Sequence, residues 1–97
     1  MKPVRVLAAA RRDIESESKY YNKAQRGLGK RFSTSVATAL RRIPANPEAM
    51  QVIEGGIRRW PVENFPHGVM YSLEQSEIVV ISVFNPLQHP SKWQRRV

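Results

Sequence analysis

The sequence has no cysteine among its 97 residues. This absence excludes disulfide bonds, a thiolate nucleophile and thiolate-bound zinc, and it fits a reducing compartment. Long apolar runs are also missing, because no stretch approaches the ~20 residues of a membrane span. The run at Met1–Leu7 is too short for the apolar core of a signal peptide. We therefore expect a soluble, cytoplasmic, unprocessed protein.

Residues that hold metals or build nucleophilic sites are scarce. The two histidines, His67 and His89, stand far apart without a carboxylate at ligand spacing, so we expect each to be an ordinary surface or turn residue. No Ser-His-Asp order and no phosphate-binding glycine loop occurs, and Gly27-Leu28-Gly29 reads as a turn between helices. The sequence predicts no metal site and no cofactor.

Negative charge is in short supply. Sixteen Lys and Arg stand against eight Asp and Glu, which gives a net charge of +8. Such a charge attracts polyanions or an acidic protein, and it also keeps a small protein in solution. Charge by itself does not choose between a nucleic acid and an acidic partner.

The length predicts one domain spanning residues 1–97, because a chain of this size buries only ~60–65% of its unfolded surface and cannot divide into two cores. Residues 4–7 are expected to form a short strand. The spacing predicts a helix over 8–24 and a second over 28–43, ended by Pro44. The glycines of residues 27–29 allow the reversal between them.

Three β-rich runs follow the helices, at 55–60, 65–73 and 78–84. Pro61 marks an irregular strand end. The run 78–84 is apolar on both faces, so it is expected to lie centrally, with the helices on one side and a ligand or partner on the other. The expected fold class is α+β, a helical hairpin packed on a small, mainly antiparallel sheet, in the order β-α-α-β-β-β.

Arginines at the start of the second run are candidates for binding. Arg58 and Arg59 are adjacent, so on a strand they point to opposite faces and only one can enter a concave surface. The other is expected to be solvated or to pair with Glu54 or Glu63. The planar fork of donors on arginine suits phosphate or carboxylate recognition.

The carboxyl end, residues 88–97, carries a second group of candidates: Lys92, Trp93, Arg95 and Arg96. This basic, aromatic segment can stack on a base or lie in a partner groove; the alternative is a frayed tail with Trp93 pinned to the core. Basic doublets at residues 11–12, 30–31 and 41–42 fall on outward helix faces. For these we favour solubility and a landing surface for an acidic partner.

The order of these segments resembles the ParE/RelE superfamily of bacterial toxins, and most closely its ParE-like branch. The resemblance rests on the first strand, Ala10-Arg11-Arg12-Asp13-Ile14, Tyr20-Tyr21, Gly27 to Phe32, Ile43 to Pro47, Gly56-Ile57-Arg58-Arg59, Phe65-Pro66, Met70-Tyr71 and Glu77 to Val80. It implies a toxin of a type II toxin–antitoxin pair, a plasmid stabilisation module. It also implies a cognate antitoxin partner, acidic and partly disordered, in a toxin–antitoxin hetero-oligomer.

The superfamily implies two competing activities. ParE-like members inhibit DNA gyrase by binding and lack a nuclease set, whereas RelE-like members are ribosome-dependent mRNA endoribonucleases with a carboxyl-terminal acid/base group. This chain has Asn85 where such members have a histidine, and an amide cannot titrate. The resemblance therefore favours the gyrase inhibitor, not an enzyme.

Two alternatives stay open. The first is the endoribonuclease, with Arg58 or Arg59 holding phosphate and His89 or Lys92 as proton donor. The second is a non-toxic nucleic-acid-binding relative that uses the basic tail.

Overall fold

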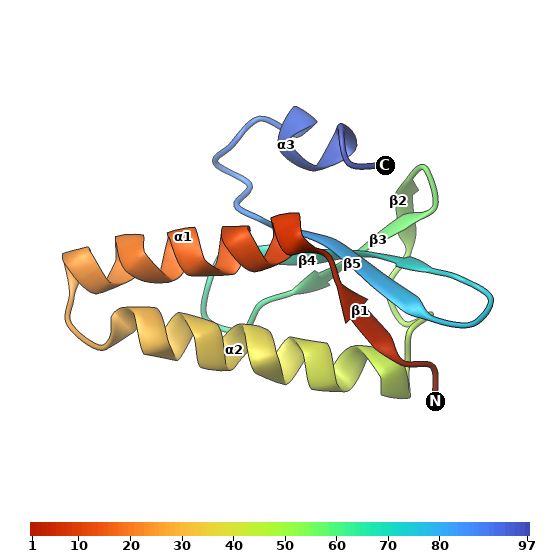
Figure 1. The fold of residues 1–97 in the computed structure, drawn as a ribbon, viewed down its shortest axis with the longest axis horizontal. Helices are drawn as coiled ribbons and strands as arrows, with labels where there is room; N and C mark the ends of the chain where they lie inside the picture. The colour runs from red at the N-terminus through yellow and green to blue at the C-terminus, as the bar shows by residue number, and fades with distance from the viewer.

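A computed structural model describes residues 1–97 and gives the order of elements along the chain. They are β1 (Val4–Val6), α1 (Ala8–Ala24), α2 (Leu28–Arg42), the 3-10 turn η1 (Ile43–Ala45), β2 (Val52–Glu54), β3 (Ile57–Pro61), β4 (Gly68–Leu73), β5 (Ile78–Phe84) and α3 (Ser91–Gln94). Figure 1 shows the two long helices side by side, with the turn between them projecting beyond the sheet. None of the helices combines the length and the apolar character that spanning a bilayer requires.

The strands form one five-stranded sheet in the order β1-β5-β4-β3-β2. β1 pairs with β5 in parallel, and the other three pairings are antiparallel. This confirms the predicted α+β class and the mainly antiparallel sheet. Three elements were not predicted: the 3-10 turn η1, the edge strand β2 and the terminal helix α3.

The helical hairpin is tightly closed at its tip. Gly29 is not a turn residue, as the sequence suggested, but the second residue of α2, and its Cα faces α1. A Cβ placed there would lie 2.2 Å from the backbone oxygen of Ser18. The same contact is reinforced by a 2.7 Å hydrogen bond between the hydroxyls of Ser18 and Ser33. Only glycine permits this approach of the two helices.

The main core lies between the hairpin and one face of the sheet. From α2 it takes Phe32, Val36 and Ala39, which recur at the predicted helical spacing and are buried. They pack on the sheet residues that alternate toward the helices, among them Val69, Tyr71, Ile78 and Val80. This face, called here the helix face, is closed by the hairpin.

The opposite face of the sheet, called here the second face, is also covered, but by the carboxyl end of the chain. Trp93 of α3 is only 4% exposed and packs with Ile57, Met70, Val79, Ile81 and Phe84. The expectation that β5 leaves its second side to a ligand or partner is therefore wrong for the area under Trp93. The chain's own tail buries that apolar surface.

The run at 55–60 is a turn followed by a strand. Gly55 and Gly56 have φ values of 59° and 77°. A two-residue hairpin turn of type I′ requires such positive φ values at both of its central residues. These glycines connect β2 to β3. β2 lies at the edge of the sheet, and its Val52 and Ile53 are 51% and 53% exposed. Pro61 ends β3, as predicted.

Candidate functional site

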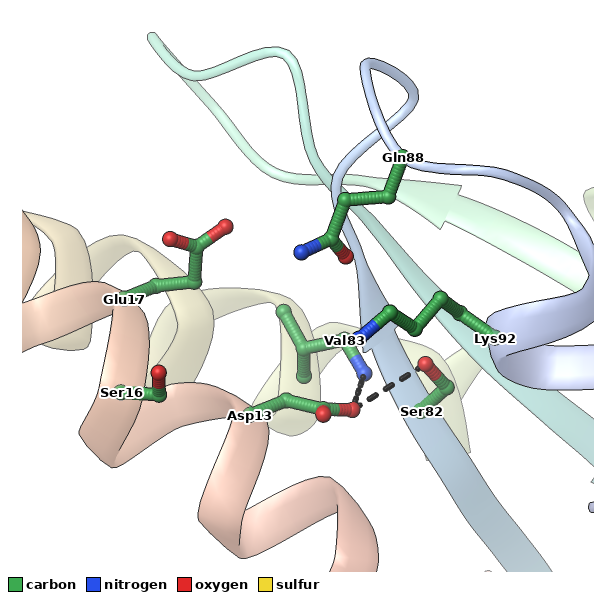
Figure 2. Close-up of a pocket in the computed structure, with 7 residues that line it drawn as sticks. All are labelled: Asp13, Ser16, Glu17, Ser82, Val83, Gln88 and Lys92. Atoms are coloured by element: carbon green, nitrogen blue, oxygen red, sulfur yellow. Dashed lines mark hydrogen bonds between the residues drawn. The ribbon is translucent and has the colours of Figure 1, made fainter.

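A small polar cleft opens between α1 and the end of β5 (Figure 2). Its volume is about 110 Å³, and one of its lining residues, Val83, is hydrophobic. Asp13 and Glu17 enter from α1, one helical turn apart, while Gln88 and Lys92 reach in from the tail. Ser16 and Ser82 complete this polar cleft.

Asp13 seals a free strand edge at the floor of the cleft. β1 pairs with β5 only as far as Val80, so the backbone groups that follow have no strand beside them. Asp13 Oδ2 accepts hydrogen bonds from Val83 N at 3.0 Å and from Ser82 Oγ at 3.1 Å. Arg96 donates to the carbonyl of Ile81 at 3.0 Å and forms a two-pronged pair with Asp13 at 2.7 and 3.1 Å. The pair closes the edge that β1 leaves open.

Glu17 joins three segments of the chain. Its Oε1 lies 2.8 Å from His67 Nε2 and accepts from Asn85 Nδ2 at 3.2 Å. His67 is fully buried between the rings of Tyr21 and Phe32, and its Nδ1 has no hydrogen-bond partner. The expectation of a surface or turn histidine is wrong for His67. It fixes the entry to β4 against α1.

Arg58 lies on the helix face and holds the segment before β2. Its Nη1 donates to the backbone oxygens of Met50 and Glu48, and it forms no pair with Glu54 or Glu63. Beside it the hydroxyl of Tyr71 donates to the Pro47 oxygen at 2.7 Å. Burial raises the pKa of Tyr71, and the neighbouring Arg58 charge opposes this shift. Arg58 is thus half-buried and engaged.

Arg59 points to the second face, because it sits opposite Met70 in the β3–β4 register. Its Nη2 donates to the Pro66 oxygen at 3.0 Å. The two arginines therefore lie on opposite faces, as their adjacency predicted. Neither pairs with Glu54 or Glu63, which was one of the two alternatives expected for the second arginine; both guanidinium groups donate to backbone oxygens instead. No cavity contains either guanidinium.

The tail residues have separate roles. His89 is exposed, and its Nδ1 accepts from Ser91 N at 3.1 Å, which fixes the turn into α3. Lys92 lines the polar cleft, Trp93 is buried, and Arg96 pairs with Asp13. Arg95 is exposed and has no carboxylate within ion-pair distance. The predicted basic end is therefore an ordered segment, and its cations do not gather into one binding site: one lines the cleft, one is paired with Asp13 and one is exposed.

A larger groove of about 380 Å³ remains beside α3 on the second face. Ile57, Val79 and Ile81 contribute its apolar part, and the Arg5–Glu77 pair stands on its rim. The hydrogen bonds from Arg5 lower the pKa of Glu77, and those same contacts raise the pKa of Arg5. This apolar groove is the uncovered remainder of the second face.

Sequence reasoning missed Asp13, Glu17 and His67 as structural connectors. One signal was present: two carboxylates four residues apart beside the apolar stripe of α1, in a chain with few acids. In a strongly basic protein, an acid next to a buried stripe is a candidate for an internal partner. Which cation it meets depends on the tertiary fold.

Comparison of the sequence with known protein families and with curated proteins gives no match. Comparison of the structure does. A chain of a solved structure described as the chromosomal ParDE TA system from P. aeruginosa superposes with a TM-score of 0.79 at 16% sequence identity. The superposition covers 88% of this chain and 96% of that one. The chain therefore shares the fold of a chain of that ParDE system.

Proposed function

We propose that this protein is the toxin of a type II toxin–antitoxin pair, and that it acts by binding and inhibiting DNA gyrase. The likeness of its fold to a chain of a ParDE system, over 88% of its length, carries the proposal. The net charge of +8 supports it, because a cationic toxin attracts an acidic inhibitor. The cognate antitoxin is an acidic, partly disordered protein that covers the working surface, and the pair acts in the cytoplasm as a plasmid stabilisation module.

The working surface in this proposal is the second face with the carboxyl end. Arg59 and the apolar groove lie on the second face, and two exposed cations lie at the carboxyl end, Lys92 within α3 and Arg95 directly after it. Trp93 and Arg96 hold α3 in place, so they support this surface from beneath. Arg58 fixes the β2 segment from the helix face.

The geometry favours binding over RNA cleavage. General acid/base cleavage requires the proton donor and the phosphate-holding cations around one point. Arg58 and Arg59 lie on opposite faces, and neither shares a cavity with His89 or Lys92. Asn85 at the end of β5 donates to Glu17 and cannot titrate. We therefore infer a protein that inhibits by docking and has no nuclease activity.

The test is inhibition of purified gyrase. Relaxed plasmid, ATP and gyrase are incubated with the protein, and we expect loss of supercoiling or accumulation of cleaved DNA. Arg59→Ala is expected to weaken inhibition, while Lys23→Ala, an exposed cation at the tip of α1, is the matched control. Unchanged supercoiling without a cleavage complex would contradict the proposal.

Growth assays separate the remaining readings. Expression of this chain alone is expected to arrest growth, and co-expression of an acidic protein from the adjacent reading frame is expected to restore it. Cutting of ribosome-bound mRNA would instead support the endoribonuclease. Unaffected growth at high soluble expression would leave the non-toxic relative.

A further inference from the structure

The positive charge is concentrated on the helical hairpin. Residues 8–42 carry nine Lys and Arg and only three acids. Two of those acids, Asp13 and Glu17, are turned inward and bonded to Arg96 and His67. They do not neutralise the outer surface of the hairpin at short range. Its outer face is therefore more cationic than the sequence count indicates.

The cations on α2 form a stripe. Lys30, Thr34, Thr38 and Arg41 recur at steps of four, four and three, on the side of the helix opposite the buried residues. Arg31 lies beside this stripe, and α2 contains no acidic residue. Lys30, Arg31 and Arg41 have no carboxylate within ion-pair distance. Together with Lys19 of α1 they are called here the basic face.

Two shallow depressions lie in the basic face and meet at Lys30. The first includes Lys19, Asn22 and Ser33, and the second Arg31, Thr34 and Ser35. Neither contains a large apolar side chain. Asn22 accepts from Gly27 N with its Oδ1, so its amide N–H groups remain available as donors. The surface thus offers cations with small polar groups between them.

This composition suits phosphate better than protein. Phosphate contacts are made by Lys and Arg with Ser, Thr and Asn, whereas protein interfaces depend on buried aromatic and apolar anchors. The large exposed apolar residues of the chain are Met1, Tyr20, Val52, Ile53, Leu87 and Val97, and none lies on α2. An acidic protein segment would find charge here but no anchor.

We propose that the basic face binds the phosphate backbone of a duplex nucleic acid. Lys30 and Arg41 are 11 residues apart on one helix, which corresponds to roughly 16 Å or about five base-pair steps. A row of cations of this length can contact successive phosphates along one strand without contacting the base edges, so we expect binding to be independent of the nucleotide sequence. The contact needs neither gyrase nor an antitoxin. The helix α2, which carries most of the basic face, lies on the opposite side of the molecule from α3 (Figure 1).

The release of counterions from the duplex predicts how strongly the binding constant depends on salt concentration. Four cations that neutralise four phosphates give a slope of log K against log salt of about −3 to −4. Each lost contact lowers the magnitude of that slope by about 1. A surface that only keeps the protein in solution would show no such site-specific change.

The test is fluorescence anisotropy of a labelled 20-base-pair DNA duplex, repeated with duplex RNA, between 50 and 200 mM salt. We expect the triple variant Lys30→Gln, Arg31→Gln, Arg41→Gln to bind about tenfold or more weakly, with a slope reduced by about 2 to 3. The matched control, Lys92→Gln with Arg95→Gln on the tail, is expected to change affinity less than twofold. All five side chains are exposed, and unchanged thermal unfolding verifies the fold.

Three results would overturn the proposal. If the wild-type protein binds neither duplex at 50 mM salt, the basic face is not a nucleic-acid-binding site. A larger loss in the tail variant moves the site to the carboxyl end. Binding of an acidic polyglutamate peptide that depends on the triple set, without duplex binding, identifies a protein partner instead. Gyrase inhibition is measured separately, so the two proposals fail independently.

Discussion

The two faces of the sheet are buried by different means. On the helix face, a core of 11 buried residues lies between the sheet and two helices that are 17 and 15 residues long, and both helices contribute to it. On the second face, the buried cluster has six residues, five from the sheet and Trp93 from α3, a helix of four residues. Helices shorter than about 12 residues are marginal by themselves, so α3 depends on its contacts with the sheet. We therefore expect the cover of the second face to open at a lower free-energy cost than the core of the helix face.

The cover has two fastenings that differ in chemistry. The ring of Trp93 buries apolar area against Met70 and Ile81, and Arg96 reaches the edge of β5 and Asp13. Both contacts hold the end of the chain against the second face. The following predictions test this difference between the faces.

The largest effect is expected from truncating a large aromatic ring on each face. Phe32→Ala should cost about 3–5 kcal/mol of unfolding free energy, because its cavity lies inside the helix-face core. Trp93→Ala removes a larger ring but should cost only about 1–2 kcal/mol, because its loss is limited by the free energy that docks α3. Urea unfolding measures both.

Hydrogen exchange separates the two variants. Trp93→Ala should speed exchange within residues 91–97 while the amides of α2 stay protected. Phe32→Ala should lower protection throughout. Equal losses of unfolding free energy for the two substitutions would show that both faces of the sheet belong to one cooperative core. That result would contradict the proposed difference between the helix face and the second face.

A smaller effect than that of Phe32→Ala is expected at the Asp13–Arg96 pair. Asp13→Asn keeps the shape of the side chain but leaves only one oxygen to accept from Arg96 and Val83 N, and it removes the negative charge. We expect the free energy of unfolding to fall by about 1.5–3 kcal/mol. Arg96→Gln should lose less, and the double variant should show a coupling of about 1 kcal/mol. Additive losses in urea unfolding would show that the pair does not hold the tail.

The smallest effect is expected on the rim of the apolar groove. Arg5 lowers the pKa of Glu77, so the folded state gains stability that is complete above the ordinary carboxyl value of 4.5 and is lost as pH falls through the lower folded value. Glu77→Gln should narrow the difference in Tm between pH 7 and pH 3. Glu63→Gln, 3.8 Å from Arg42 and exposed, is the control. Identical pH profiles for wild type and Glu77→Gln would refute the assignment.

Much of the fold was readable from local patterns. The bounds of α1 match the predicted 8–24, and α2 ends one residue before the predicted 43. These succeed because helical periodicity and proline at position 44 are local signals. β2 was missed since three exposed residues have no alternation to detect, and its turn at Gly55–Gly56 was taken as part of a strand.

The candidate site was less readable. The opposite orientation of Arg58 and Arg59 follows from strand geometry and was predicted. Their carbonyl partners were not, since Met50 and Pro66 come close only through the folding of two loops. The burial of His67 depends on rings from both helices, which no local pattern contains.

The sequence by itself determined the periodic elements, the absence of thiol chemistry and the excess of positive charge, because these depend on residue identity and short-range spacing. Only the tertiary structure decided which cations are engaged and which are free. Asp13 takes Arg96 from the tail, and α2 keeps Lys30 and Arg31 unpaired. The physical reason is that ion pairs and burial depend on distances between segments far apart in the chain, which only packing sets.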